Sequence, residues 1–71
     1  MRTRRRAFLL NVGAKVRARR ARLSLTQSEL AARAKLHVNV IGRVERGQFN
    51  PTVMTLVAIA NALRISITRL V

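Results

Sequence analysis

Apolar residues recur at helical spacing along the chain. Leu9, Val12, Val16 and Leu23 are separated by three, four and seven residues, as on one face of a helix, and Arg20 falls on the same stripe. No segment shows the alternation of a strand, and no internal repeat or linker is present. The pattern predicts a single all-α domain whose first helix covers residues 7–23.

Capping residues mark the next two helices. Thr26 is a good N-cap for a helix over residues 27–34. Residues 35–37 then form a turn. A third helix over residues 38–45 is predicted to end at Gly47, because glycine readily adopts the backbone conformation that follows a helix.

Two further helical segments follow a loop marked by Pro51. Thr52 is placed to cap a fourth helix over residues 53–63, and Ser66 to cap a last turn over residues 67–70. The residues expected to face inward from the fourth helix are Leu56, Val57, Ala60 and Leu63. The chain therefore predicts five short helices.

The window at 27–46, QSELAARAKLHVNVIGRVER, has small or apolar residues wherever two helices crossing at a steep angle must touch. These residues are Leu30, Ala31, Ala34, Leu36, Ile41 and Val44. The window predicts a helix-turn-helix made by the second and third helices.

The charge of the chain is strongly positive. Its 71 residues include 15 Lys+Arg and 2 Asp+Glu, which gives a formal net charge of +13. Because self-repulsion destabilises a compact fold, this charge points to an anionic partner, first a nucleic acid and second an anionic membrane. A helix-turn-helix on so cationic a domain favours double-stranded DNA.

The first six residues predict a flexible basic arm ahead of a domain over residues 7–71, because they lack apolar periodicity. The arginines of this arm, which could contact DNA or form a solubility tail, are Arg2, Arg4, Arg5 and Arg6. The apolar run after the arm is too short for a signal peptide, and no run approaches the ~18–20 residues that span a bilayer. We expect no membrane partner and a cytoplasmic, nucleoid-associated location.

The chain offers little material for catalysis. It has two acidic residues, one histidine and no cysteine, so it lacks an obvious acid–base pair, nucleophile or metal cluster. We therefore expect neither an enzyme nor a protein with a metal, a cofactor or a small-molecule substrate.

Four stretches carry a family resemblance: LTQSELA at 25–31, VIGRVERG at 40–47, NPT at 50–52 and the final TLVAIANALRISITRLV. They resemble the phage-repressor and Cro type of helix-turn-helix family, often called XRE-like. The resemblance implies a five-helix, lambda-repressor-like DNA-binding domain, usually a homodimer on a partly palindromic operator. Lys35 and Arg64 stand where this family usually has glycine, and a left-handed backbone there would cost roughly 1 kcal/mol at each.

In such a motif the third helix lies in the major groove with its N-terminal residues toward the base edges. The base-reading candidates are Val38, Asn39, Gly42 and Arg43. Asn39 can pair with adenine, Arg43 with guanine, and Val38 can pack on a thymine methyl. Gly42 would let the helix approach closely. We expect His37 to act as a cap or a phosphate contact rather than as a base reader.

Other polar residues are candidates for phosphate contacts. Gln27 resembles the family residue whose amide and backbone N–H grip a phosphate at the start of the second helix, and Thr26 could assist. Arg46, Gln48 and Asn50 follow the third helix and would lie along the phosphate strand. Asn50 could equally serve to shape the turn before proline.

The two acidic residues have structural interpretations. Burial of Arg20 or Glu45 without a partner would cost several kcal/mol, and the resemblance implies that they form an internal ion pair between the first and third helices. Glu29 is expected to pair with Arg33, four residues later, on the surface of the second helix.

The C-terminal apolar residues Ile65, Ile67, Leu70 and Val71 are candidates for a symmetric homodimer contact. The alternative is that they close the core. A two-fold dimer would place operator half-sites about 10 bp apart.

The leading functional interpretation is a sequence-specific transcriptional regulator, most simply a repressor. The sequence does not separate a phage repressor, a restriction–modification controller and an antitoxin, the last of which would add a protein partner. The alternative is a nonspecific nucleoid-type or membrane-active cationic protein. Both would bind in a salt-dependent way, but only the first would prefer a sequence.

Overall fold

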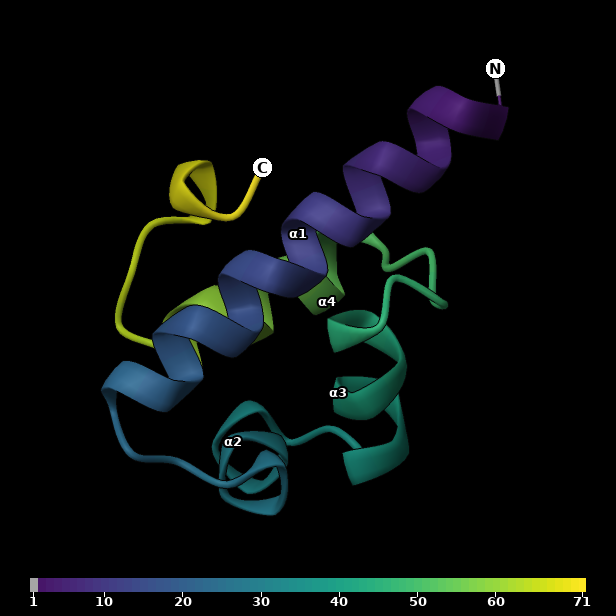
Figure 1. The fold of residues 1–71 in the computed structure, drawn as a ribbon. Coiled ribbons are helices and arrows are strands. Elements are labelled where there is room, and N and C mark those ends of the chain that lie inside the picture. The colour runs from purple at the N-terminus through teal and green to yellow at the C-terminus, as the bar shows by residue number, and fades with distance from the viewer. Residues whose placement is uncertain (1) are drawn as a thin grey trace.

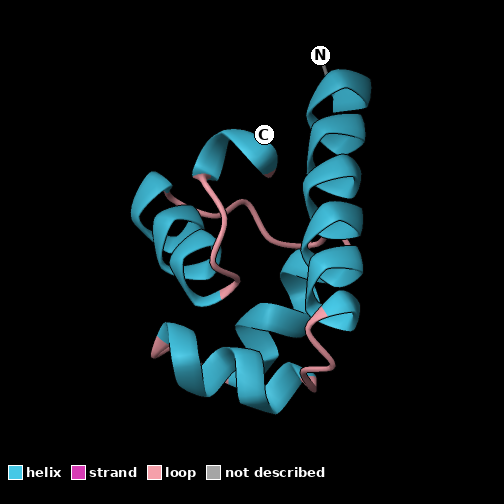
Figure 2. Ribbon diagram, turned by 90° about the vertical axis from the view of Figure 1, so that its left-hand side faces the viewer, coloured by secondary structure: helices cyan, strands magenta, loops and turns pink. Residues whose placement is uncertain are grey.

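The computed structural model describes residues 2–71, with the side chains from Arg4 onward. Four α-helices, α1 (Arg2–Arg22), α2 (Gln27–Ala34), α3 (Val38–Glu45) and α4 (Val53–Ala62), are followed by the 3₁₀ turn η1 (Ile67–Arg69) (Figure 1). No strand occurs in this range. Helix α1 stands along one edge of the molecule and the other helices pack to one side of it (Figure 2).

The expected bounds are confirmed for α2 and α3, whereas α1 and α4 each end one residue earlier than expected. The start of α1 and the expected count of five helices are wrong. Helix α1 already begins at Arg2, not at residue 7, so residues 2–6 are helical. Arginine is a good helix former, and no proline or glycine interrupts the first turns. The fifth element is a 3₁₀ turn, because the Arg69 N–H donates to Ser66 O (3.0 Å) and the Leu70 N–H to Ile67 O (2.9 Å).

Side-chain caps start the short helices where the sequence places them. The Glu29 N–H donates to Thr26 Oγ1 (3.0 Å), and the Thr26 N–H donates back to Glu29 Oε1 (2.8 Å), which completes a capping box. These bonds lower the pKa of Glu29, the bond from the Thr26 backbone most of all. The expected pair with Arg33 is not formed, because the carboxylate turns back to the start of the helix.

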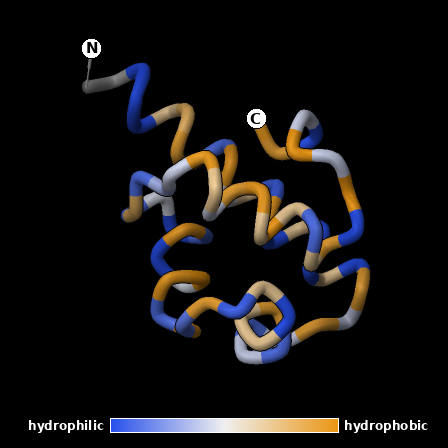
Figure 3. The backbone as a smooth tube through the Cα atoms, turned by 180° about the vertical axis from the view of Figure 1, so that it is seen from behind, coloured by the Kyte–Doolittle hydropathy of each residue, from blue (hydrophilic) through white to orange (hydrophobic). Residues whose placement is uncertain are grey.

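One apolar core joins all the elements, and Figure 3 shows apolar stretches in each helix. Its fully buried large side chains are Val12, Val16, Leu30, Ile41, Val44, Ile59, Leu63 and Leu70. Leu56 and Ala60 are also buried, as expected, whereas Val57 is only half-buried and Ile59 takes the central place.

Three helices end in the same way, with a non-glycine residue in the left-handed region. Ser24, Lys35 and Arg64 have φ of 55°, 57° and 58°. After each of them an apolar residue donates its N–H back into the helix, from Leu25 to Arg20 O, Leu36 to Ala31 O and Ile65 to Ala60 O. The apolar side chain that follows is buried or half-buried, so core packing holds these strained turns in place.

Gly13 allows α1 and α3 to touch through their backbones. A Cβ at this position would overlap the Val44 carbonyl oxygen and lie 2.7 Å from the Glu45 carbonyl oxygen. Because backbone atoms cannot move aside cheaply, only glycine fits this crossing.

We predict that Gly13→Ala lowers the free energy of unfolding by about 1–3 kcal/mol through overpacking. In an ordinary helix interior the same change would raise the free energy of unfolding by roughly 0.5–1 kcal/mol. Thermal unfolding followed by circular dichroism shows whether the variant is less or more stable than the parent. A higher melting temperature would show that the two backbones are not in close contact.

We predict that Lys35→Gly raises the free energy of unfolding by about 0.5–1 kcal/mol, because glycine relieves the left-handed strain. Lys35→Ala is the matched control, since it removes the same charge but keeps the Cβ. In chemical denaturation, the glycine variant should have a higher free energy of unfolding than both the alanine variant and the parent. Equal stability of the two variants would attribute the effect to charge.

Candidate nucleic-acid interface

Helices α2 and α3 form the predicted helix-turn-helix. The residues expected at their crossing are buried or, for Leu36, half-buried. Lys35 makes the left-handed turn between the helices, and His37 starts α3. Figure 1 shows α3 on the outer side of the molecule, away from η1.

A hollow of about 330 Å³ opens along the exposed side of α3. Its lining consists of Gln27, Val38, Asn39, Gly42, Arg43 and Arg46. All four base-reading candidates and two of the phosphate candidates therefore meet at one place. We call this place the α3 hollow.

Gly42 leaves the floor of the α3 hollow open. A Cβ there would lie 3.1 Å from Arg46 Nη1 and 3.7 Å from Gln27 Oε1. Both neighbours are ends of flexible side chains, so glycine here provides space for an incoming group rather than a backbone contact.

Arg43 and Arg46 are held by the loop that follows α3. The Arg43 guanidinium lies 5.5 Å from the centroid of the Phe49 ring, and its Nη2 donates to Gln48 O (3.3 Å). Arg46 Nε donates to Gln48 Oε1 (3.0 Å). The side chain of Gln48 therefore orients Arg46. Sequence reasoning missed Phe49, because its contact exists only once the chain turns back after Gly47.

The remaining phosphate candidates do not line the hollow. The Asn39 N–H donates to His37 Nδ1 (3.0 Å), which makes His37 the N-cap of α3 and leaves Nε2 as the donor of the neutral ring. Thr26 caps α2, and Asn50 is exposed in the loop before α4.

An ion pair connects α1 to α3 behind the hollow. Arg20 Nε lies 2.6 Å from Glu45 Oε2, and Arg20 Nη2 donates to Glu45 Oε1 (3.0 Å). Arg20 Nη1 also donates to Leu25 O (2.8 Å). The Glu45 side chain is only 3% exposed and that of Arg20 17%. The hydrogen bond to Glu45 raises the pKa of Arg20 above its ordinary value, against the opposing effect of burial.

Gln27 joins this ion pair from α2. Its Nε2 donates to Glu45 Oε1 (3.0 Å), so one amide N–H is occupied and the other remains available. The carboxylate of Glu45 thus connects three helices, and it fixes Gln27 at the edge of the α3 hollow.

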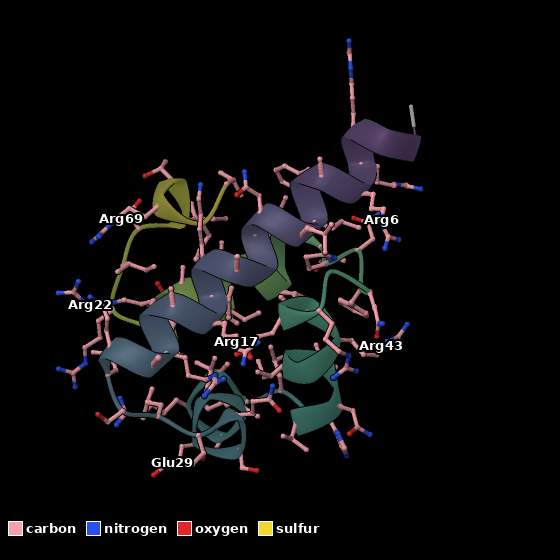
Figure 4. All side chains as sticks on the ribbon, viewed as in Figure 1. Arg6, Arg17, Arg22, Glu29, Arg43 and Arg69 are labelled. Carbon is pink, nitrogen blue, oxygen red and sulfur yellow. The ribbon has the colours of Figure 1, made fainter. Side chains whose placement is uncertain are left out.

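The predicted basic arm continues α1 beyond the rest of the molecule (Figure 1). Arg4, Arg5 and Arg6 are exposed, and the side chain of Arg2 lies outside the described residues. Figure 4 shows Arg6 on the same side of the molecule as Arg43, whereas Arg22 and Arg69 lie on the other side.

The C-terminal apolar residues close the core instead of forming an exposed patch. Leu70 is fully buried, and Ile65 and Ile67 pack half-buried against the core. Leu70 is therefore corrected from a dimer candidate to a core residue. Of the four candidates only Val71 is exposed. Two apolar side chains at the start of α4 that were not predicted to be exposed, Val53 (69%) and Met54 (74%), are more exposed than Val71.

Among the described residues, no helix is both long enough and apolar enough to cross a membrane. Nor do three or more histidine or acidic side chains come together in residues 2–71 as they would around a metal ion.

We predict that Glu45→Ala lowers the free energy of unfolding by about 3 kcal/mol, because it leaves Arg20 without its partner in a largely buried place. The double variant Arg20→Met/Glu45→Leu removes both charges and should lose less stability than Glu45→Ala. Thermal melting compares the two. If Glu45→Ala melts like the parent, the pair does not stabilise the fold.

Residues 16–70 match the helix-turn-helix family model HTH_3. The immunity repressor protein of Bacillus phage phi105 is 37% identical over 62 residues, which cover 87% of this chain and 43% of the repressor. The uncharacterized HTH-type transcriptional regulator y4dJ of Sinorhizobium fredii is 40% identical over 60 residues, covering 84% of this chain and 78% of that protein. This chain thus spans less than half the length of the phage repressor.

Two solved structures share the fold. The restriction-modification controller protein C.AhdI from Aeromonas hydrophila superposes with a TM-score of 0.89 at 34% identity, covering 92% of this chain and 98% of that one. The clp gene regulator ClgR from Corynebacterium glutamicum gives a TM-score of 0.83 at 25% identity, with 89% and 82% covered. With its helix-turn-helix, its α3 hollow and these relatives, the chain belongs to the XRE-like helix-turn-helix family of transcriptional regulators.

Proposed function

We propose that this protein is a transcriptional repressor that binds double-stranded DNA as a homodimer and reads its operator with α3. The observation that carries the proposal is the α3 hollow, where carboxamide and guanidinium donors and one apolar side chain converge on an exposed helix face. The mode of action is binding without catalysis.

The lining of the α3 hollow suits base edges in the major groove. Asn39 offers an amide that can bond adenine N6 and N7, and Arg43 offers a fork that matches guanine O6 and N7. Val38, half-buried at the start of α3, can contact a thymine methyl. The contact with the Phe49 ring already restricts the rotamers of the Arg43 side chain. Arg43 therefore loses less conformational entropy when it binds DNA.

Donors at the rim of the hollow suit phosphate oxygens on either side of the groove. The free amide N–H of Gln27 lies at the N-terminus of α2, where the helix dipole favours an anion. His37 Nε2 lies at the N-terminus of α3, and Arg46 at its other end. Such contacts would set the register of α3 in the groove without reading sequence.

The homodimer is supported by exposed apolar surface on a small domain. Val53 and Met54 project from the start of α4, and Val71 is also exposed. A symmetric contact through such residues would bury them. Helix-turn-helix dimers bind half-sites about one DNA turn, or 10 bp, apart. Repression is supported by the phage immunity repressor among the relatives.

The first experiment is selection of bound duplexes from a random pool, followed by fluorescence anisotropy at about 150 mM salt. An enriched two-fold repeat that binds about 10³-fold or more tightly than scrambled DNA is the expected result. Equal binding to every duplex would identify a nonspecific DNA-coating protein instead.

We predict that Arg43→Ala weakens binding to the selected operator by about 1–3 kcal/mol and relaxes the preference at one base pair of each half-site. Arg33→Ala is the matched control, because it removes an exposed arginine of α2 that does not line the α3 hollow. Anisotropy on operators with single base changes measures both effects. An unchanged base preference in Arg43→Ala would remove this residue from the reading face.

A further inference from the structure

A second basic hollow lies where α1 meets the C-terminal segment. It measures about 190 Å³ and is lined by Lys15, Ala18, Arg19, Arg22, Ile65 and Arg69. Four of these six residues are cationic. We call it the α1 hollow.

The α1 hollow faces away from the α3 hollow. Gly13 and Arg20 lie on the side of α1 that packs against α3. Lys15 and Arg22 each lie two positions further along, which places them about 160° around the helix from Gly13 and Arg20. Figure 4 shows this separation, with Arg22 and Arg69 on one side of the molecule and Arg43 on the other.

The cations of the α1 hollow have no acidic partner. Glu45 is bonded to Arg20 and Gln27, and Glu29 is bonded to Thr26, so both acids of the chain are engaged elsewhere. Arg19 Nε donates to Leu63 O (3.1 Å), which anchors one guanidinium at the hollow. Four neighbouring cations without a counter-charge repel one another, and a polyanion relieves that repulsion.

We infer that the α1 hollow binds the phosphodiester backbone of a second DNA duplex, so that the protein bridges two duplex segments. The inference rests on the proposed function, because the α3 hollow must hold the first duplex. Lys15, Arg22 and Arg69 then supply sequence-independent phosphate contacts. Protein already bound to DNA meets neighbouring segments at high effective concentration, so weak contacts suffice.

Charge argues against a second copy of this chain in the α1 hollow. A symmetric contact there would bring eight like charges together, counting four lining cations from each copy. The exposed apolar residues Val53 and Met54 lie outside the lining. A homodimer contact through Val53 and Met54 and duplex bridging can therefore use different surfaces.

The test is a capture assay with the full chain. An operator duplex is fixed on beads and saturated with protein, and a fluorescent duplex of unrelated sequence is added at about 100 mM salt. Arg22→Gln/Arg69→Gln removes two cations of the α1 hollow. Arg33→Gln/Arg64→Gln is the matched control, because it removes two exposed arginines that line neither hollow.

We expect the parent and the control to capture the second duplex and the Arg22→Gln/Arg69→Gln variant to capture about ten-fold less, as for two lost phosphate contacts. Anisotropy on a single operator should be equal in the two double variants. Equal capture by both variants would overturn bridging through the α1 hollow, as would no capture by a parent that still binds the operator.

Two further outcomes separate the neighbouring hypotheses. If the parent does not bind a single operator duplex, the proposed function is overturned together with the bridging that rests on it. Vesicles of phosphatidylglycerol form a parallel arm, since lipid headgroups carry the same phosphate chemistry. Binding to vesicles that falls in Arg22→Gln/Arg69→Gln, without capture of DNA, would reassign the hollow to a membrane surface.

Discussion

The carboxylate of Glu45 lies where α1, α2 and α3 meet, and the orientation of α3 depends on it. A guanidinium from α1 and an amide from α2 both donate to this almost fully buried side chain. A buried charge is tolerable only when it is paired and hydrogen-bonded, so the three helices are held in one relative arrangement. The same arrangement places Gln27 and Arg46 beside Gly42 and shapes the α3 hollow.

Close backbone approach complements this ion pair. Gly13 lets α1 rest directly on the C-terminal end of α3, about two helical turns along α1 from the Arg20–Glu45 contact. The left-handed residues Lys35 and Arg64 turn the chain sharply enough for apolar residues after them to reach the core. Strain in these turns is balanced by burial in a domain that has few residues to spare.

Both acidic residues are engaged in contacts within the molecule, which leaves the surface with an excess of positive charge. Glu45 neutralises Arg20 and Glu29 is bound in a helix cap, so nearly all the remaining charge faces outward as cations. Two of these cations line the α3 hollow and four others line the α1 hollow. A protein with this distribution presents positive charge to DNA in more than one direction.

Much of the secondary structure could be predicted from the sequence, because helix caps and apolar spacing act between residues close in the chain. The helix-turn-helix and the bounds of α2 and α3 follow from caps and apolar spacing, which act within a few residues. The residues on the exposed face of α3 follow too, because side chains on one short helix share a face by periodicity alone. The start of α1 was predicted wrongly, since arginine repeats carry no apolar period although they are good helix formers.

Only the tertiary structure decided the contacts between residues distant in sequence. The stacking of Arg43 on Phe49, the backbone contact at Gly13, the burial of Leu70 and the α1 hollow all depend on how separate elements pack. Periodicity predicts which side of a helix is apolar, but it cannot say which partner covers that side. Packing of whole helices fixes those partners, and it thereby decides where the protein can meet its ligand.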